Sequence, residues 1–127
     1  MADKARVLAM GLDPEVVDFS RSLIPGLTKE SLTAAIDAER IKLEALGYRV
    51  RMLLIDTGKT AEAVVRQALE QEGYDCIMIG AGVRVAPDQF LLFEKLINVI
   101  HRHAAPSTKI CFNTRPDDSA EAVQRWV

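Results

Sequence analysis

The stretch "YRVRMLLIDTGKTAEAVVRQALEQEGYDCIMIG", residues 48–80, contains the pattern that decides the fold. Two of its runs, 48–56 and 74–80, are apolar nearly throughout, as is typical of strands buried on both faces of a sheet. Between them, apolar residues recur at the spacing of one helix face: Ala61, Val64, Val65, Ala68 and Leu69. We expect Thr60 to cap this helix and Gly73 to end it. The succession predicts two parallel strands joined by a helical crossover.

The same alternation of strands and helices continues in both directions along the chain. The further elements that we expect are strands over 6–11 and 108–114 and helices over 28–46, over 88–103 and from Asp118 onward. This order of elements is similar to the flavodoxin-like superfold, although the usual fifth strand is missing. The resemblance implies a three-layer α/β/α fold with a doubly wound parallel sheet of four strands in the order 2-1-3-4. We expect residues 1–127 to form a single α/β domain.

Several residues are typical of helix ends. Thr28 is a candidate cap for the first long helix, and Gly47 is placed to stop it. Asp88 is expected to begin the helix that follows the third strand. Asp118 and Glu121 have the spacing of a capping box for the last helix.

Composition and charge fit an ordinary globular protein. The chain has 49% hydrophobic and 27% charged residues and a formal net charge of -2, which predicts no nucleic-acid partner. Its apolar runs are too short to cross a bilayer, and its first residues lack the apolar core of a signal peptide. We therefore expect a cytoplasmic protein with no membrane partner.

The cysteines and histidines do not suggest a metal site. Cys76 and Cys111 both lie in apolar runs, which favours free buried thiols, with a disulfide as the alternative. His101 and His103 are two residues apart, so on a helix they point away from each other. Because they close a helix, they should also lie at the end of the sheet opposite the strands' carboxyl ends. No metal and no cofactor is assigned.

The segment 12–27 is long for a connection between a strand and a helix. Asp13, Pro14 and Glu15 form a helix start signal, and Pro25 with Gly26 forms a stop, so we expect the segment to contain its own helix. It has apolar side chains to bury, namely Val16, Val17, Phe19, Leu23 and Ile24. The segment is interpreted either as a structural flap or as a lid over a ligand.

Two glycine-containing stretches have only part of a known phosphate-binding pattern. In "LLIDTGKT" the position of the first phosphate-loop glycine is occupied by Leu53, so the turn before Thr60 is too short to surround a triphosphate. In "IGAGVRVAP" the third glycine of a dinucleotide fingerprint is replaced by Val85. Neither stretch therefore predicts a nucleotide site.

Two classes of protein with the flavodoxin-like architecture, receiver domains and cobalamin-binding domains, are excluded because this chain lacks their characteristic residues. Receiver domains have an aspartate at the end of the third strand, where this chain has Gly80, and Asp13 alone cannot assemble their magnesium site. Cobalamin-binding versions use an Asp-x-His-x-x-Gly loop, and no histidine precedes His101.

Ligands of open α/β sheets bind beyond the carboxyl ends of the strands. The candidate ligand-binding residues at this edge are Asp13, Asp56, Thr57, Gly80, Gly82, Arg84, Asn113 and Arg115, with Glu15 nearby. With two arginines, this set predicts a small anionic ligand that bears a phosphate or carboxylate. Alternatively, the glycines form a tight turn and Arg84 pairs with Asp88 or Asp117. No catalytic residue is assigned, although an enzyme that uses Asp13 or Asp56 as acid or base is a further alternative.

A non-catalytic interaction or assembly module is another alternative, because helix 88–103 has apolar residues on more than one face. Its expected core-facing set is Phe93, Leu96, Ile97 and Ile100, and the additional apolar residues are Phe90, Leu91, Leu92 and Val99. Strand 108–113 would be an edge strand with little charge. We expect a homodimer or a larger assembly through this helix and this strand, the alternative being a monomer in which segment 12–27 covers the additional apolar residues.

Overall fold

The computed structural model describes residues 5–22, 24–85 and 87–127 and contains one parallel sheet. Its strands are β1 (Arg6–Leu12), β2 (Arg49–Ile55), β3 (Cys76–Ile79) and β4 (Lys109–Phe112). Their order is β2-β1-β3-β4, and every neighbouring pair is parallel. The predicted sheet and strand order are confirmed.

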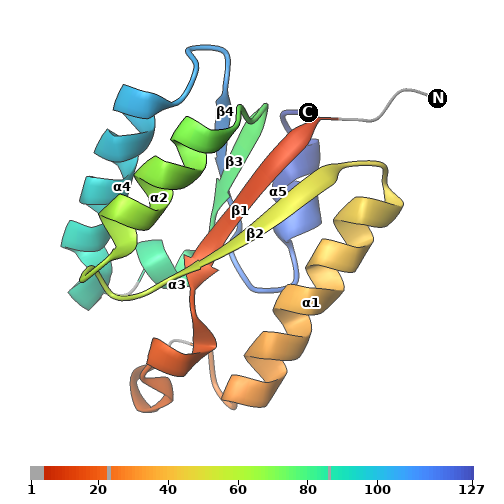
Figure 1. Cartoon of the computed structure of the whole chain (residues 1–127). Helices are drawn as coiled ribbons and strands as arrows, with labels where there is room; N and C mark the ends of the chain where they lie inside the picture. The colour runs from red at the N-terminus through yellow and green to blue at the C-terminus, as the bar shows by residue number, and fades with distance from the viewer. Residues whose placement is uncertain (1–4, 23, 86) are drawn as a thin grey trace.

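Helices cover both faces of this sheet (Figure 1). The main helices are α1 (Lys29–Ala45), α2 (Ala61–Gln71), α4 (Phe90–His103) and α5 (Ser119–Gln124). Helices α2 and α4 lie on one face, and α1 and α5 lie on the other. The structure is consistent with the three-layer flavodoxin-like fold that the order of elements implied.

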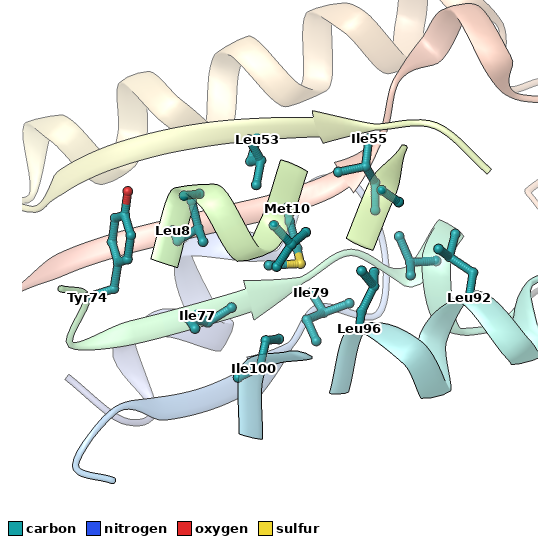
Figure 2. Close-up of a cluster of buried hydrophobic side chains, with 14 residues drawn as sticks. Leu8, Met10, Leu53, Ile55, Tyr74, Ile77, Ile79, Leu92, Leu96 and Ile100 are labelled. Atoms are coloured by element: carbon teal, nitrogen blue, oxygen red, sulfur yellow. The ribbon is translucent and has the colours of Figure 1, made fainter. Parts of the chain in front are cut away.

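The face under α2 and α4 is the larger apolar core (Figure 2). It buries Leu8, Met10, Ile77 and Ile79 of the central strands against the two helices. The stripe predicted on α2 is confirmed, because Ala61, Val65 and Ala68 are buried and Val64 and Leu69 pack against the cluster. On α4 the buried residues are Leu92, Leu96 and Ile100, whereas Phe93 and Ile97 are half-buried. Leu92 is therefore a core residue, and its expected place on a second apolar face is wrong.

The face under α1 and α5 is built from smaller side chains, among them Ala9, Cys76, Cys111, Ala120 and Ala122. The two cysteines are free and buried, as predicted, with 3.5 Å between their sulfur atoms. The hydrogen bond to Cys76 and burial raise the pKa of the Cys111 thiol, which keeps it protonated.

The ends predicted for α1 at Thr28 and Gly47 are confirmed. Thr60 and Asp118 lie at the N-cap positions of α2 and α5, as predicted, but their side chains form no capping hydrogen bond with these helices. Thr28 caps α1 in a reciprocal pair with Ser31, and Gly47 follows the helix with a φ of 98°. Thr60 donates its hydroxyl to Asp56 instead of accepting from α2. The Asp118 carboxylate likewise accepts from Thr114 and Arg115 and forms no capping box with Glu121.

The connections after β1 and β3 differ from the predictions. Asp13 caps a turn as expected, but the described residues of segment 12–27 contain only two single 3-10 turns, η1 (Pro14–Val16) and η2 (Phe19–Arg21). The backbone at Val17 and Asp18 is extended, which prevents a longer helix. After β3 a short unpredicted helix, α3 (Ala81–Arg84), is followed by the turn η3 (Pro87–Gln89), so that α4 begins at Phe90 rather than Asp88. Leu23 lies outside the described residues.

Among the residues that the structure describes, no helix combines the length and the apolar character needed to span a membrane.

Candidate functional site

A pocket of about 770 Å³ lies on the α1 and α5 side of the sheet, at the carboxyl ends of the strands. It is lined by residues of β1 and β3, where the order of the strands reverses, together with residues of α1, the segment after β1 and the start of α5. This is the position at which open α/β sheets bind their ligands.

The sheet has room for this pocket because its carboxyl edge carries very small residues on this face. Gly11 of β1 pairs with Leu54 of β2, and Gly80 donates its N–H to Met10 at 2.8 Å. Ala9 lies one pleat earlier on the same face, since side chains alternate along a strand. A Cβ atom on Gly11 would meet no atom within 4 Å, so the absence of a side chain at Gly11 leaves open space in the pocket.

The walls of the pocket around these small residues are apolar, and other side chains cover them only in part. Leu32 and Ile36 of α1 face the pocket and are half-buried, and Leu54 keeps 41% of its surface exposed. Segment 12–27 closes another side with apolar residues, namely Val16, Val17, Ile24 and Leu27. The segment is therefore a wall of the pocket in this structure.

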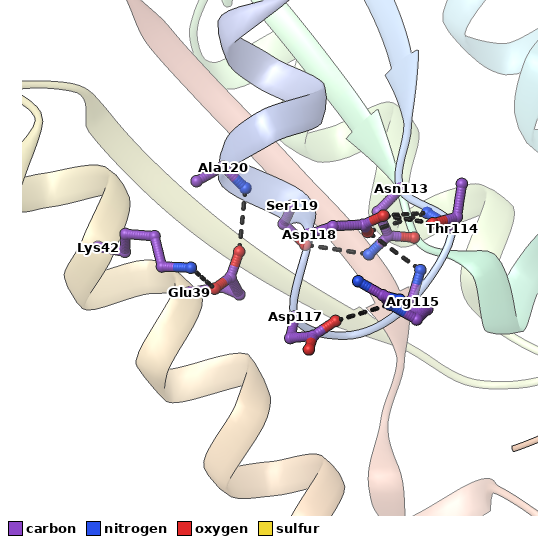
Figure 3. Close-up of polar contacts among 9 residues, drawn as sticks. All are labelled: Glu39, Lys42, Asn113, Thr114, Arg115, Asp117, Asp118, Ser119 and Ala120. Atoms are coloured by element: carbon purple, nitrogen blue, oxygen red, sulfur yellow. Dashed lines mark hydrogen bonds and ion pairs between the residues drawn. The ribbon is translucent and has the colours of Figure 1, made fainter.

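One end of the pocket is polar, and three buried side chains form it: Glu39, Asn113 and Ser119 (Figure 3). The amide oxygen of Asn113 accepts the Ala81 N–H at 2.7 Å, and its nitrogen donates to the Ser119 hydroxyl at 3.0 Å. We call these three residues the polar end. Within the part of the chain that the structure describes, no other residue with a charged, amide or aliphatic hydroxyl side chain is buried.

Glu39 connects α1 to the start of α5. Its Oε1 atom accepts the Ala120 N–H at 3.0 Å, and its Oε2 atom lies 2.7 Å from the Lys42 ammonium group (Figure 3). This arrangement gives a buried carboxylate a counter-ion and satisfies a backbone N–H of α5. Glu39 therefore holds a fixed position at the pocket wall.

Comparisons with protein-family models, curated proteins and solved structures find no match for this chain. The function of the pocket is therefore argued from its own shape and chemistry.

The structure divides the eight predicted ligand-binding residues into two groups. Thr57, Gly80, Gly82 and Asn113 line the pocket. Asp13, Asp56, Arg84 and Arg115 are engaged elsewhere: Asp13 accepts the Glu15 N–H at 2.9 Å, and Arg115 pairs with Asp117 at 3.1 Å.

Arg84 points away from the pocket. Its Nη2 atom donates to the backbone oxygen of Asn113 at 2.6 Å, and its guanidinium lies 5.3 Å from the centre of the Phe112 ring. Its expected pairing with Asp88 or Asp117 is wrong, because Asp88 lies 3.2 Å from Arg21 and Asp117 pairs with Arg115. Within the described residues, its buried Nε atom has no hydrogen-bond partner. Arg84 thus braces the end of β4 from outside the pocket.

The "DTGKT" turn is closed on itself, which agrees with the expectation that it forms no phosphate loop. The Asp56 carboxylate accepts from the Gly58 and Thr60 N–H groups and from the Thr60 hydroxyl, at 2.7 to 3.1 Å. These hydrogen bonds, with that of the Thr60 hydroxyl the largest cause, lower the pKa of Asp56 to about 2 from an ordinary 3.8.

The low pKa of Asp56 predicts a contribution to stability that depends on pH. Because the folded pKa is depressed, the contribution is present above the ordinary value and is lost as pH falls from about 4 toward 2. Replacing Thr60 with valine should raise the Asp56 pKa toward 3.8, because it removes the hydroxyl donor. Carbon-13 NMR titration of the Asp56 carboxyl group measures both values. Equal midpoints in the two proteins would contradict the assigned cause.

Charged groups at the pocket are few. Asp18, Arg21, Glu39 and Asp88 line it, and two of them, Arg21 and Asp88, pair with each other. The described residues contain no group of three or more His, Cys, Asp or Glu side chains placed to hold a metal ion. The pocket can therefore enclose an apolar body and offer hydrogen bonds at its polar end.

Sequence analysis missed Glu39 and Ser119. A signal for Glu39 was present, because it interrupts the apolar side of α1 between Ile36 and Leu43 at helical spacing. Ser119 lies at the first position of α5, where serine is common, so its sequence context contained no such signal.

Proposed function

We propose that this protein binds a small, largely apolar molecule in the pocket between the sheet, α1 and the segment after β1. The observation that supports this most is the pocket itself, at about 770 Å³ and with a mainly apolar lining. Ligand sites of small molecules fall in the range of roughly 300 to 1,000 Å³ and combine apolar walls with a few fixed polar groups. The polar end supplies such groups.

The charges around the pocket favour a neutral ligand over the anionic one that the sequence suggested. Arg84 and Arg115, which were expected to meet an anion, do not line the pocket. The acids that do line it outnumber its single arginine, and that arginine already pairs with Asp88. An anion brought into the pocket would lose water without gaining a free cation.

A matched pair of glycine variants tests this proposal. Replacing Gly11 with leucine fills open space in the pocket, whereas replacing Gly73 with leucine makes the same change at a position that does not line it. Neither glycine has a positive φ, so both substitutions suit the backbone. We expect the affinity for Nile red, a neutral apolar dye, to fall at least about tenfold in Gly11→Leu, or about 1.4 kcal/mol. Fluorescence titration measures this.

In Gly73→Leu the dye affinity should equal that of the unchanged protein. If Nile red does not bind, or binds equally to both variants, the pocket is not its site and the proposal fails.

Exposed apolar residues near the start of α4 favour self-association as well. Phe90 and Leu91 keep 59% and 64% of their surfaces exposed, and β4 is a short edge strand. We propose a homodimer through this helix and strand. A native mass spectrum measures subunit number and any retained small molecule together, and a monomer at micromolar concentration would contradict the dimer.

A further inference from the structure

We propose that the polar end binds a neutral hydroxyl or primary amide group of the ligand, whose apolar body lies along Gly11, Leu32 and Ile36. This inference rests on the proposed function and specifies the class of molecule: a neutral amphipathic compound with one head group that both donates and accepts hydrogen bonds.

The polar end has hydrogen-bonding capacity that the protein does not use. The Ser119 oxygen accepts from Asn113, and within the described residues its hydroxyl donates no hydrogen bond. The Asn113 amide nitrogen uses one of its two hydrogens for Ser119. A ligand oxygen placed here would accept from both groups.

Glu39 supplies the complementary acceptor. A carboxylate has about four lone-pair sites, and here one contact is to Ala120 and one is to Lys42. Glu39 also lies beside Ser119, because Ala120 is the next residue in the chain. A hydroxyl or amide hydrogen can therefore meet Glu39 while the same head group accepts from Ser119.

Charge selects against ionised head groups. A ligand carboxylate would lie beside the buried Glu39 carboxylate, where like charges repel strongly. A ligand ammonium would compete with Lys42, which already neutralises Glu39 at 2.7 Å, and would lose its hydration. A neutral group carries neither cost.

A series of compounds with one tail and four head groups tests the inference: 1-octanol, octanamide, octanoate and octylammonium. Each is titrated at neutral pH against the protein with Nile red bound, and displacement of the dye gives its affinity. We expect octanol and octanamide to bind at least about fivefold more tightly than the two ions. This difference converts to roughly 1 kcal/mol.

The Ser119→Ala variant shows whether the head group lies at the polar end. The affinity for octanol should fall about fivefold in Ser119→Ala. Ser107→Ala, an exposed serine in the loop before β4 that does not line the pocket, is the control. Thermal unfolding of each variant confirms that the fold is retained.

The outcomes separate the two proposals. If Nile red binding is lost in Gly11→Leu but the ions bind as tightly as octanol, or Ser119→Ala leaves octanol binding unchanged, the head-group inference is wrong and the pocket remains. If the affinity for Nile red is the same in Gly11→Leu as in the unchanged protein, both proposals fail.

Discussion

Replacing Asn113 with alanine should lower the free energy of unfolding by about 2 to 3 kcal/mol. The buried amide oxygen of Asn113 is the acceptor for the Ala81 N–H at 2.7 Å, and its nitrogen donates to Ser119. Alanine would leave the Ala81 N–H buried without a partner, and an unsatisfied buried donor costs about 1 to 3 kcal/mol. Loss of the bond to Ser119 adds to this. Urea unfolding followed by far-ultraviolet circular dichroism measures the change.

Asn98→Ala provides the control for this substitution. Asn98 lies exposed on α4, and its amide donates to the Glu94 backbone oxygen within the same helix. We expect its removal to change stability by no more than about 0.5 kcal/mol. Equal losses in the two variants would show that Asn113 does not hold the polar end together.

Replacing Leu96 with alanine should destabilise the protein by about 3 kcal/mol. Leu96 is fully buried in the core between α4 and the sheet (Figure 2). Truncating a buried leucine removes its transfer free energy and leaves a cavity, at a total cost of about 2 to 5 kcal/mol. That is a large share of a typical stability of about 5 to 15 kcal/mol. The urea midpoint should fall with little change in slope.

Leu91→Ala is the matched control on the same helix. Leu91 is 64% exposed, so its truncation should change the stability of the folded subunit by about 0.5 kcal/mol or less. If Leu91→Ala costs as much as Leu96→Ala, then Leu91 is buried in solution, as the proposed dimer would require, and native mass spectrometry of the unchanged protein should show more than one subunit. An unchanged stability for Leu96→Ala would contradict the assigned core.

The architecture could be predicted from local sequence patterns because the positions of apolar residues depend on which faces of each strand and helix are buried. Runs such as Cys76–Ile79 are apolar at every position, as in strands covered on both faces, and their short length favours a strand over a buried helix. The helix between β2 and β3 has its apolar residues on one side, which places it on the sheet. Connection rules then limit the strand order to very few possibilities.

The predictions that differ from the structure lie where a residue distant in the sequence, or a competing side chain, determines the local conformation. Helix α3 begins at Ala81, whose N–H is held by Asn113, a residue 32 positions away that local propensity does not include. The side-chain caps predicted at Thr60 and Asp118 are absent for a different reason. In each case a threonine and an aspartate four residues apart bind each other, so neither the Thr60 hydroxyl nor the Asp118 carboxylate caps the helix that follows it.

The pocket lies at the edge of the sheet where the sequence predicted a ligand site, but the chemistry of the pocket depends on side-chain directions. Thr57, Gly80, Gly82 and Asn113 were expected at this edge and line the pocket. The long side chains of Arg84 and Arg115 start from the same edge but turn to Asn113 and Asp117. Backbone position is set by topology, whereas the direction of a long side chain is set by the partners within its reach.

The two faces of the sheet separate the core that stabilises the fold from most of the residues that line the pocket. In many proteins the same residues do both. The face under α2 and α4 contains the large aliphatic core, whereas the pocket lies on the opposite face above Gly11 and Ala9. Gly11, Leu32 and Ile36 line the pocket and lie outside the larger core. This separation makes the chain a suitable scaffold for engineering: a library varied at these three positions should change which molecules the proposed site binds, while the packing that maintains the fold stays intact.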